Sequence, residues 1–580
     1  MIKRLAGCVR EYKKQTFLAP LLVILECAVD ILIPTLMAAL IDKGIDVGDM
    51  ANIWKYGLLM LLCVLTGIAL GIAGGRISAV ASAGFAKNLR HDIFYRVQTF
   101  SFANIDKFST GSIVTRLTTD VSRVQMAFMM TIRMAVRSPF NLIFALIMAL
   151  RIHVGLALIF LAAIPLLGFG LGIISVKVHP HFRRAFEVYD RMNTVVQEDL
   201  RGIRVVKSFV REEYEESKFN KVAGEMYNAF CKAEKLLALN SPIMQTAMYS
   251  CTLLVAWFGA RIIVGSGSAD LTTGELTSLI SYATQVLMSL MMLSMVFVMI
   301  IMSRASMQRV YEILIEESDL QNGENPVTEV PDGSVRFENV SFSYAKDENR
   351  LCLFDVDLDI RSGETIGILG GTGSSKSTLV QLIPRLYDTT LGRVLVGGKD
   401  VREYDMAALR DQVAMVLQKN DLFSGTVKEN LRWGNENATD EELIHACELA
   451  QADGFIREFP DGYDTYIEQG GSNVSGGQKQ RLCIARALLK KPKILILDDS
   501  TSAVDTQTDA MIRKAFREYI PDTTKFIIAQ RVASVEDADR ILILDNGHVD
   551  AFDTPEALLA SNAIYREIYY SQVKGGRSDG

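Results

Sequence analysis

A glycine-rich segment in the second half of the chain has residue types and a spacing suited to holding phosphate. It follows an apolar run at 365–369 and consists of Gly370, Gly371, Thr372, Gly373, Ser374, Ser375, Lys376, Ser377 and Thr378. Between a strand and a helix, such a loop aims backbone N–H groups at phosphate oxygens, and the helix N-terminus adds positive potential. Lys376 is expected to reach the outer phosphates, and the Ser377 hydroxyl to bind Mg²⁺. We therefore predict a nucleotide site here.

A second segment, residues 473–505, has the order turn, helix, strand and acid that is typical of a phosphate site. A turn of Ser475, Gly476, Gly477 and Gln478 opens a basic helix at 479–490. After a proline, an apolar strand at 494–497 ends on two carboxylates, Asp498 and Asp499. The two segments together favour nucleotide binding far more strongly than either does alone.

Three further positions complete the candidate site. Tyr344, which follows a strand-like alternation beginning at residue 335, is placed to stack on adenine. Gln418 follows the apolar strand at 413–417 and could sense Mg²⁺ or the outer phosphate; Gln530 follows another strand at 525–529. Strands alternating with helices, with ligand loops at the strand ends, predict a P-loop α/β domain.

Bulk composition limits the class of protein. The chain has 580 residues, too many for one core, so several domains are expected. Its net charge of −6 gives no sign of the excess of basic residues that nucleic-acid-binding proteins carry. Nearly half of the residues are apolar (49%). None of the eight scattered cysteines forms a CxxC pair, so neither a zinc site nor a disulfide framework is expected. The first apolar run lacks a small-residue cleavage site, and no removable signal peptide is predicted.

Six apolar runs in the first half are long enough to cross a bilayer, at about 20 residues each. They lie at about 17–40, 56–80, 131–150, 154–176, 236–264 and 276–302. Residues 1–14 are basic and amphipathic, and the second and fourth loops between the runs are long and rich in Lys and Arg. Positive charge on the inner side places both termini in the cytosol of a multi-pass protein of the cell (inner) membrane.

Two features inside the runs are candidates for a substrate cavity. Glu26 and Asp30 lie four residues apart on one helical face, and intramembrane charge faces either a cavity or a partner helix. The last run carries a methionine stripe that includes Met291, Met295 and Met299. Methionine adapts its shape, so the stripe suits a promiscuous apolar cavity, although helix packing or lipid contact explains it equally well.

The chain divides into a membrane domain at 1–316, a linker at 317–334 rich in acidic residues, Gly and Pro, and a nucleotide-binding domain at 335–575. The loops at 81–130 and 177–235 have helical patterns but no further span. Bends near 108–115 and 202–209 are therefore candidates for the contact that transmits force, against the alternative of ordinary solvated helix.

With these residues in view, the second half resembles the nucleotide-binding domain of ATP-binding cassette (ABC) transporters over its full length. The matching positions are the A-loop Tyr344, Walker A 370–378, the Q-loop Gln418, the signature 474–478 beginning at Val474, Walker B 494–498 and a D-loop that includes Ser502 and Asp505. The whole chain is similar to one half of an exporter. The resemblance implies ATP and Mg²⁺ as ligands, Mg²⁺ being held by Ser377 and Gln418, and a head-to-tail pair of cassettes in which each signature completes the neighbour's site.

Two departures from the family pattern affect its chemistry. The residue after the Walker B aspartate is ordinarily a glutamate that polarises water, and here it is Asp499; the switch histidine is replaced by Gln530. Aspartate is one methylene shorter, and the carboxamide carries no positive charge. A third departure is Ser375, where a glycine is expected in the tight turn.

These departures predict a slow ATP site beside an intact signature. The chain is then the degenerate subunit of a heterodimeric multidrug-type exporter, which lends Ser475 and its neighbours to a partner half-transporter with the usual Glu and His. Its substrate would be an apolar or amphipathic small molecule moved out across the lipid bilayer. Two alternatives stay open: a slow homodimeric exporter of lipid or peptide, and a regulatory or gating subunit that binds ATP but moves nothing.

Overall fold

The computed structural model describes residues 1–500 and 504–575, apart from the side chains of 171, 175, 179 and 573–575. Cα packing divides it into two compact units. Unit 1 comprises residues 1–98 and 110–316, and unit 2 comprises residues 99–109 and 317–580.

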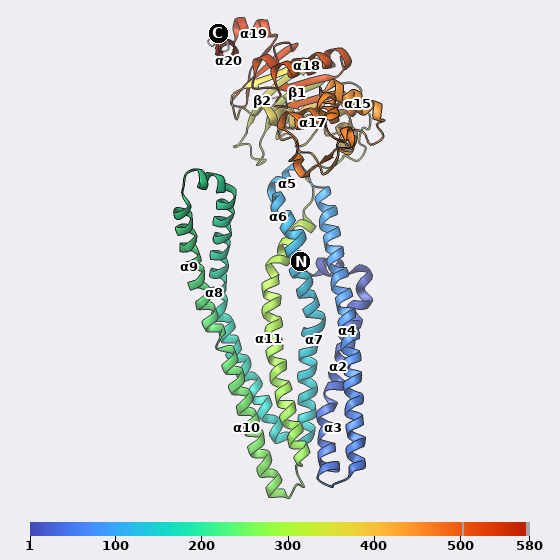
Figure 1. Cartoon of the computed structure of the whole chain (residues 1–580), viewed down its shortest axis with the longest axis vertical. Coiled ribbons are helices and arrows are strands. Elements are labelled where there is room, and N and C mark those ends of the chain that lie inside the picture. Colours follow the sequence, from blue (N-terminus) through green and yellow to red (C-terminus); the bar gives the residue numbers. More distant parts are fainter. Residues whose placement is uncertain (501–503, 576–580) are drawn as a thin grey trace. The chain divides into compact units, whose positions relative to one another are not determined.

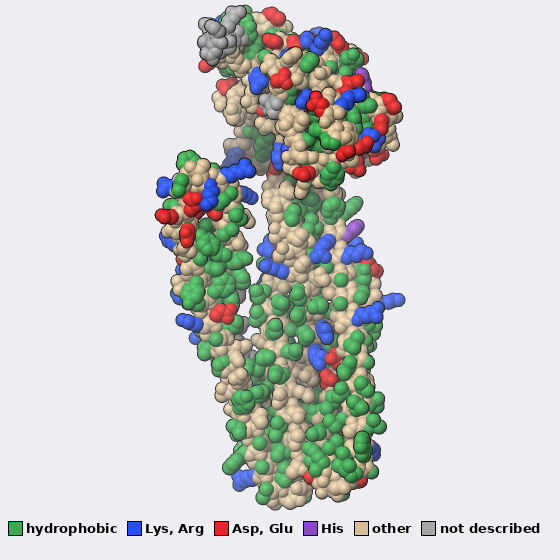
Figure 2. Space-filling model, viewed as in Figure 1, with side chains coloured by type: hydrophobic (Ala, Val, Ile, Leu, Met, Phe, Trp, Pro, Cys, Tyr) green, Lys and Arg blue, Asp and Glu red, His purple; other side chains and the backbone are tan. Residues whose placement is uncertain are grey.

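Unit 1 is entirely helical. In the part of the chain that the structure describes, six helical stretches are long and apolar enough to cross a membrane: Arg10–Ile45, Met50–Gln98, Thr110–Ile152, Val154–Ser208, Glu212–Ser266 and Thr273–Ile315. The prediction of six spans followed by a nucleotide-binding fold is confirmed. Figure 2 shows hydrophobic side chains over much of the surface of the helical unit, as expected of a surface that faces lipid.

In Figure 1, α2, α3, α4, α7 and α11 run beside one another, whereas α8 and α9 pair with each other and diverge from α7 and α11. Extensive contacts join α7 to α11, α2 to α4, and α8 to α9. Their bounds are α1 Ile2–Gly7, α2 Lys13–Asp30, α3 Leu32–Leu40, α4 Met50–Gln98, α6 Thr110–Thr115, α7 Val121–Ile152, α8 Val154–Ser208, α9 Glu212–Leu237, α10 Asn240–Ser266 and α11 Thr273–Ile315.

A reciprocal cap fixes where α11 begins. The Thr272 hydroxyl accepts from the backbone N–H of Glu275, while the Glu275 carboxylate accepts from the N–H of Thr272. Thr272 also donates to Asp42 at 2.6 Å, and the Gly274 N–H donates to the same carboxylate at 2.9 Å. The cap therefore ties the start of the sixth span to the end of the first.

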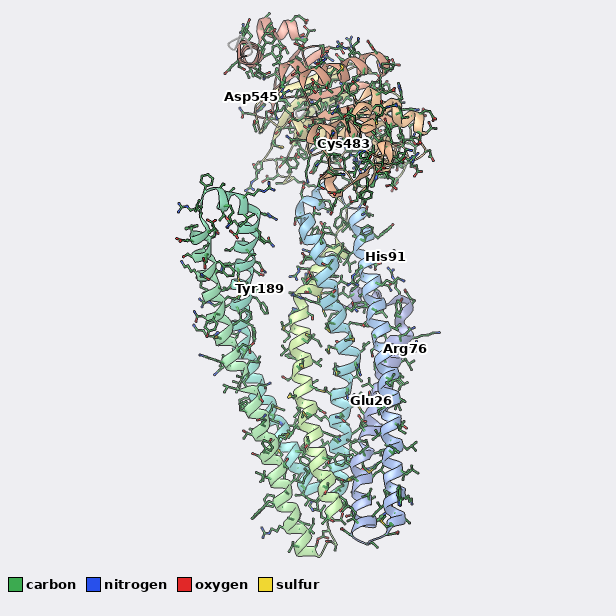
Figure 3. The ribbon with its side chains drawn as sticks, in the orientation of Figure 1. Glu26, Arg76, His91, Tyr189, Cys483 and Asp545 are labelled. Carbon is green, nitrogen blue, oxygen red and sulfur yellow. The ribbon has the colours of Figure 1, made fainter. Side chains whose placement is uncertain are left out.

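An ion-pair cluster joins the first and third spans inside unit 1. Arg137 of α7 donates to Glu26 at 2.7 Å and to Asp30 at 3.0 Å, both on α2. Glu26 is only 8% exposed, and Figure 3 shows it among α2, α4 and α7. The Arg137 guanidinium lies between the two carboxylates and compensates their charge, which would otherwise be unpaired in an apolar environment. The cluster therefore links α2 to α7.

Unit 2 is built on a six-stranded sheet in the order β12-β11-β3-β10-β9-β6. β11, β3, β10, β9 and β6 pair in parallel, and β12 is antiparallel at the edge. A second, antiparallel sheet has the order β2-β1-β4-β5. The strands are β1 Val335–Phe342, β2 Leu353–Ile360, β3 Thr365–Gly370, β4 Leu391–Val396, β5 Lys399–Asp400, β6 Val413–Val416, β7 Gly425–Thr426, β8 Tyr466–Ile467, β9 Ile494–Asp498, β10 Thr524–Ile528, β11 Arg540–Asp545 and β12 His548–Asp553.

The central strands β9 and β10 are buried throughout, because apolar cores cover both faces of the sheet. One core includes residues of α17 and α18, and the other includes residues of α12 and the antiparallel sheet. The helices of this unit are α5 Phe102–Phe108, α12 Lys376–Gln381, α13 Met406–Gln412, α14 Val427–Arg432, α15 Asp440–Leu449, α16 Asp453–Arg457, α17 Gly476–Leu489, α18 Thr506–Tyr519, α19 Pro555–Ser561 and α20 Ala563–Gly575.

The short helix α5 packs with unit 2, although the sequence placed all of 1–316 in the membrane domain. Asp106 accepts from the Tyr387 hydroxyl at 2.8 Å, and Asn104 donates to the Glu317 carbonyl at 3.2 Å. A force-transmitting role for the bend expected at 108–115 stays a prediction. At the other predicted bend, α8 ends at Ser208 and α9 begins at Glu212, and Phe209 between them is 73% exposed.

The ion-pair cluster of unit 1 predicts a stability effect. Arg137→Gln leaves Glu26 and Asp30 without their cation, and breaking such a buried pair costs about 3–5 kcal/mol. We expect the apparent unfolding temperature of the detergent-purified chain to fall by several degrees. Differential scanning fluorimetry measures it.

Arg151→Gln is the matched control, because Arg151 is an exposed residue at the end of the same helix. Adding Glu26→Gln to Arg137→Gln should recover part of the loss, since one uncompensated carboxylate is then removed. Equal unfolding temperatures for Arg137→Gln and Arg151→Gln would contradict a stabilising role for the cluster.

Candidate functional site

The glycine-rich loop connects β3 to α12, as its sequence predicts. Gly370 ends the strand with φ 154°, and a Cβ there would lie 2.2 Å from the Leu544 carbonyl oxygen, so only glycine fits. Ser375, the residue before Lys376, has φ 69° and ψ 24°. This left-handed conformation costs a non-glycine residue about 1–2 kcal/mol. The loop therefore adopts the expected turn in spite of the serine.

The Lys376 side chain folds back over this loop. Its ammonium donates to the Gly370 carbonyl at 3.0 Å, the Gly371 carbonyl at 2.8 Å and the Ser374 hydroxyl at 3.3 Å. Burial lowers the pKa of Lys376, and the charges of Asp498 and Asp499 oppose that shift. The amine is thus held by weak carbonyl partners that phosphate oxygens could replace.

Ser377 and Asp498 come together although 121 residues separate them. The Ser377 hydroxyl donates to Asp498 Oδ1 at 2.9 Å. Asp498, the last residue of β9, is 3% exposed, and burial raises the pKa of its carboxyl, with a smaller opposing effect from the Ser377 hydrogen bond. A hydroxyl and a carboxylate side by side are the oxygen ligands that Mg²⁺ prefers alongside phosphate.

Asp499 lies one residue beyond the strand and has two amide partners. Gln530 Nε2 lies 2.8 Å from Asp499 Oδ2, and Gln418 Nε2 lies 3.5 Å from the same oxygen. The backbone of Asp499 has φ 51°, and its N–H donates to the Ile528 carbonyl at 3.1 Å. The structure thus brings Gln418, Asp499 and Gln530 to one point, from the segments that follow β6, β9 and β10.

Tyr344 lies beside the first turn of α12 and is half exposed. Its hydroxyl hydrogen-bonds to Thr378 Oγ1 at 2.9 Å. Its ring meets those of Phe342 and Tyr387 edge to face, with centroids 4.9 and 5.2 Å away. This aromatic cluster extends to α5 through the hydrogen bond from Tyr387 to Asp106.

The signature segment forms the N-terminus of α17, which begins at Gly476. Ser475 and Gln478 make a reciprocal capping box: Ser475 N–H donates to Gln478 Oε1 at 2.9 Å, and Gln478 N–H donates to Ser475 Oγ at 3.3 Å. Val474 is buried and anchors the turn, whereas Ser475 and Gly476 are exposed. The positive end of a 14-residue helix is therefore open to the surface of unit 2.

Of the predicted D-loop residues, Ser502 lies outside the described residues. Asp505 is the N-cap of α18, where its Oδ1 accepts from the Thr508 N–H at 2.9 Å. Hydrogen bonds from the Thr508 backbone lower the pKa of Asp505.

Comparison with known proteins supports the family suggested by these motifs. Residues 16–291 match the model for the ABC transporter transmembrane region, and residues 353–502 match the ABC transporter model. An uncharacterized ABC transporter ATP-binding protein of Bacillus subtilis, YfiB, is 36% identical over 563 residues, covering 97% of each chain. The chain belongs to the ABC transporter family. In this ABC transporter the membrane and nucleotide-binding domains are fused in one multi-pass chain.

Two further comparisons concern another relative and the fold. YgaD of Bacillus subtilis, whose name describes multidrug export, is 31% identical over 582 residues, with 99% of each chain covered. The solved structure of a bacterial Atm1-family ABC exporter with ATP bound has the same fold, with a TM-score of 0.84 at 24% identity; the match covers 97% of this chain and 99% of that one.

The candidate cavity residues of this ABC transporter have contrasting surroundings. Glu26 and Asp30 turn to Arg137, so a partner helix does face them. Met291 and Met295 on α11 are 43% and 69% exposed in the single chain, and Met299 is less so. Methionine side chains that are exposed in a single chain are compatible with contact to lipid and with lining a cavity. A substrate role for these five residues therefore stays a prediction.

One residue of the site, Gln572 of α20, was not found from the sequence. Its Nε2 donates to the Gln530 carbonyl at 2.9 Å, and its Oε1 accepts from the Val532 N–H at 2.8 Å. This two-point contact holds the backbone on which the Gln530 side chain reaches Asp499. No local pattern marks Gln572, because it is an exposed glutamine near the end of an ordinary helix.

The contact predicts that Gln572 protects the backbone after β10. Gln572→Leu removes both hydrogen bonds, each worth about 0.5–1.5 kcal/mol, so amide exchange at residues 530–532 should quicken by roughly 2- to 100-fold. Hydrogen–deuterium exchange with mass spectrometry measures this.

Ser571→Ala is the control, because the Ser571 hydroxyl donates within its own helix, to the Ile568 carbonyl. Gln572→Glu keeps the acceptor for Val532 but places a carboxylate oxygen against the Gln530 carbonyl, so its effect should resemble that of Gln572→Leu at residue 530. Unchanged exchange in both Gln572 variants would show that α20 does not support this segment.

Proposed function

We propose that this chain is one subunit of an ATP-driven exporter in which an unlike half-transporter supplies the faster ATP site. The hydrogen bond between Asp499 and Gln530 carries the proposal. Both residues depart from the family pattern, and they are direct partners, 2.8 Å apart.

A shorter acid with an amide partner is poorly suited to activating water. A general base needs to lie within about 2.6–3.2 Å of the group that carries the proton, directly or through one water. Aspartate is one methylene shorter than glutamate, and Asp499 Oδ2 already accepts from Gln530. Because Gln530 is uncharged, it adds a hydrogen bond but no positive charge for the outer phosphate. Slow hydrolysis in this chain's own site follows.

ATP binding itself is supported by the rest of the site. Lys376 and the N–H groups of the loop would hold the phosphates, and Tyr344 the adenine. Mg²⁺ would lie at Ser377 with Gln418 and Asp498 nearby, completed by phosphate oxygens. The capped N-terminus of α17 is open to an incoming γ-phosphate from a neighbour, with Ser475 as the nearest hydroxyl donor.

The transported compound is proposed to be an apolar or amphipathic small molecule, moved outward across the cell membrane. The name of YgaD and the exposed methionines Met291 and Met295 support this class. Lys and Arg in the loops at 81–130 and 177–235 support cytosolic termini, which puts the nucleotide site where ATP is available.

The proposal predicts that the purified chain by itself hydrolyses ATP at least about 100-fold more slowly than the native complex, because a well-placed general base contributes about 10²–10⁴-fold. Phosphate release measures both rates, on the purified chain and on the complex isolated from the native membrane. Asp499→Glu should change the rate of the complex only modestly, since Gln530 still lacks a charge.

Two outcomes would favour the alternative functions over the proposed one. Brisk hydrolysis by two identical copies would establish a homodimer and refute the proposal. A complex that hydrolyses ATP but moves no amphipathic dye into inside-out vesicles would favour a regulatory subunit.

A second prediction concerns the signature. Ser475→Tyr fills the exposed N-terminus of α17, so the partner's site loses its γ-phosphate contact and turnover of the complex should be abolished. Lys376→Ala in the same chain is the control: it weakens ATP binding in the slow site while sparing much of the turnover. If Ser475→Tyr complexes keep full turnover, the assignment of this signature to the partner's site is wrong.

A further inference from the structure

A charge cluster in unit 1 lies beside two of the places where the chain passes from one unit to the other. These passages fall at 109/110 and at 316/317. The cluster, called the Asp120 cluster below, consists of Arg116 and Asp120 on the π-helical turn η3 (Arg116–Asp120), and of Arg309 and Glu312 near the end of α11. It therefore connects the chain just after one passage to the chain just before the other.

Asp120 is the centre of this cluster and is 0% exposed. Arg309 Nε donates to Asp120 Oδ2 at 2.7 Å, and Arg309 Nη2 donates to Asp120 Oδ1 at 2.5 Å. A guanidinium that holds both oxygens of one carboxylate fixes the orientation of the pair as well as the distance. The pair therefore fixes the start of α7 against α11.

Arg116 forms a second link between the same two segments. Its Nη1 donates to the Arg309 carbonyl at 2.6 Å and to Glu312 Oε2 at 3.1 Å. The two cations and two carboxylates compensate one another, so the cluster can be buried without an unpaired charge. The turn η3 that carries Arg116 and Asp120 is π-helical, a rare geometry that often occurs at functional sites.

The same two passages are also joined within unit 2. Asn104 of α5 donates to the Glu317 carbonyl at 3.2 Å, and both residues belong to unit 2. The two connections between the units are thus tied together once in each unit. A shift of one connection along the other would break hydrogen bonds at both ends.

We propose that Asp120 and Arg309 are positioning residues for ATP-driven transport, which make the two connections move as a pair. A displacement that starts in unit 2 would then reach the third and sixth spans together, because α7 and α11 are joined by extensive contacts. Packed helices with fixed ion pairs are the kind of element that carries coupling between distant sites. The inference does not depend on which subunit hydrolyses ATP or on which compound is moved.

Hydrogen–deuterium exchange at the far end of α11 tests this coupling. Thr273, the first residue of α11, lies 36 residues from Arg309, which is about 54 Å along the helix axis. The complex isolated from the native membrane is placed in nanodiscs, and exchange at residues 273–277 is compared with and without ATP, Mg²⁺ and vanadate. Wild type should show a difference that depends on the nucleotide.

Asp120→Asn and Arg309→Gln should each reduce that difference at least about threefold, while the Kd for ATP stays within about twofold of wild type. A merely structural role would change exchange equally with and without nucleotide. Arg116→Gln removes only the second link, so it should give a smaller reduction even if the variants of the buried pair do not assemble.

Arg304→Gln is the matched control, because Arg304 is an exposed cation on the same helix, and it should keep the wild-type difference. The double variant Asp120→Asn with Arg309→Gln should recover part of the loss, since two amides can hydrogen-bond and no charge is left unpaired. A wild-type difference in every variant, or the absence of any nucleotide-dependent difference in wild type, would overturn the proposal. So would an equal loss in the double and single variants, or a loss of ATP binding in the single ones.

Discussion

The parallel pairing of β3, β10 and β9 places three distant chain segments at one edge of the sheet. In the observed register, Ile528 of β10 lies opposite Ile368 of β3 and opposite Asp498 of β9. The three strands therefore end within one or two residues of the same position along the sheet. A slip of one residue would turn Asp498 to the other face and separate it from Ser377.

At these aligned strand ends, the two departures from the family pattern, Asp499 and Gln530, compensate for each other in side-chain length. The shorter Asp499 side chain remains close to its own strand end, and the longer carboxamide of Gln530 crosses the gap to it. A hydrogen bond to a carboxylate is stronger than one between neutral groups, so this pair helps keep the strand ends together. The same pairing removes a lone pair from the oxygen that water activation would need. This hydrogen bond is therefore also the basis of the proposed slow hydrolysis.

Much of this arrangement was predictable because its signals are local. The strand beginning at Thr524 was predicted to within one residue of each end, since its apolar run is bounded by polar residues. The six spans were equally clear from hydropathy over about 20 residues. The helix after the signature begins at Gly476 rather than 479, because Ser475 and Gln478 cap it and the glycines form its first turn.

Contacts made between distant segments could not be predicted. Arg137 lies 111 residues from Glu26, and nothing near either residue specifies the other. Likewise, Gln572 supports the segment at Gln530 across 42 residues from an unremarkable helix face. The departure at Ser375 was visible in the sequence, but only the φ of 69° shows that the loop keeps its turn at an energetic cost.

The packing of α5 has a consequence for how the gene can be recombined. The compact unit that contains the sheet is discontinuous, because residues 99–109 belong with it while their neighbours on both sides do not. A hybrid that joins this membrane domain to a foreign nucleotide-binding domain at Glu316 would leave α5 facing a surface without a matching Tyr387. A functional hybrid therefore needs both segments exchanged together, residues 99–109 as well as the stretch that follows Glu316.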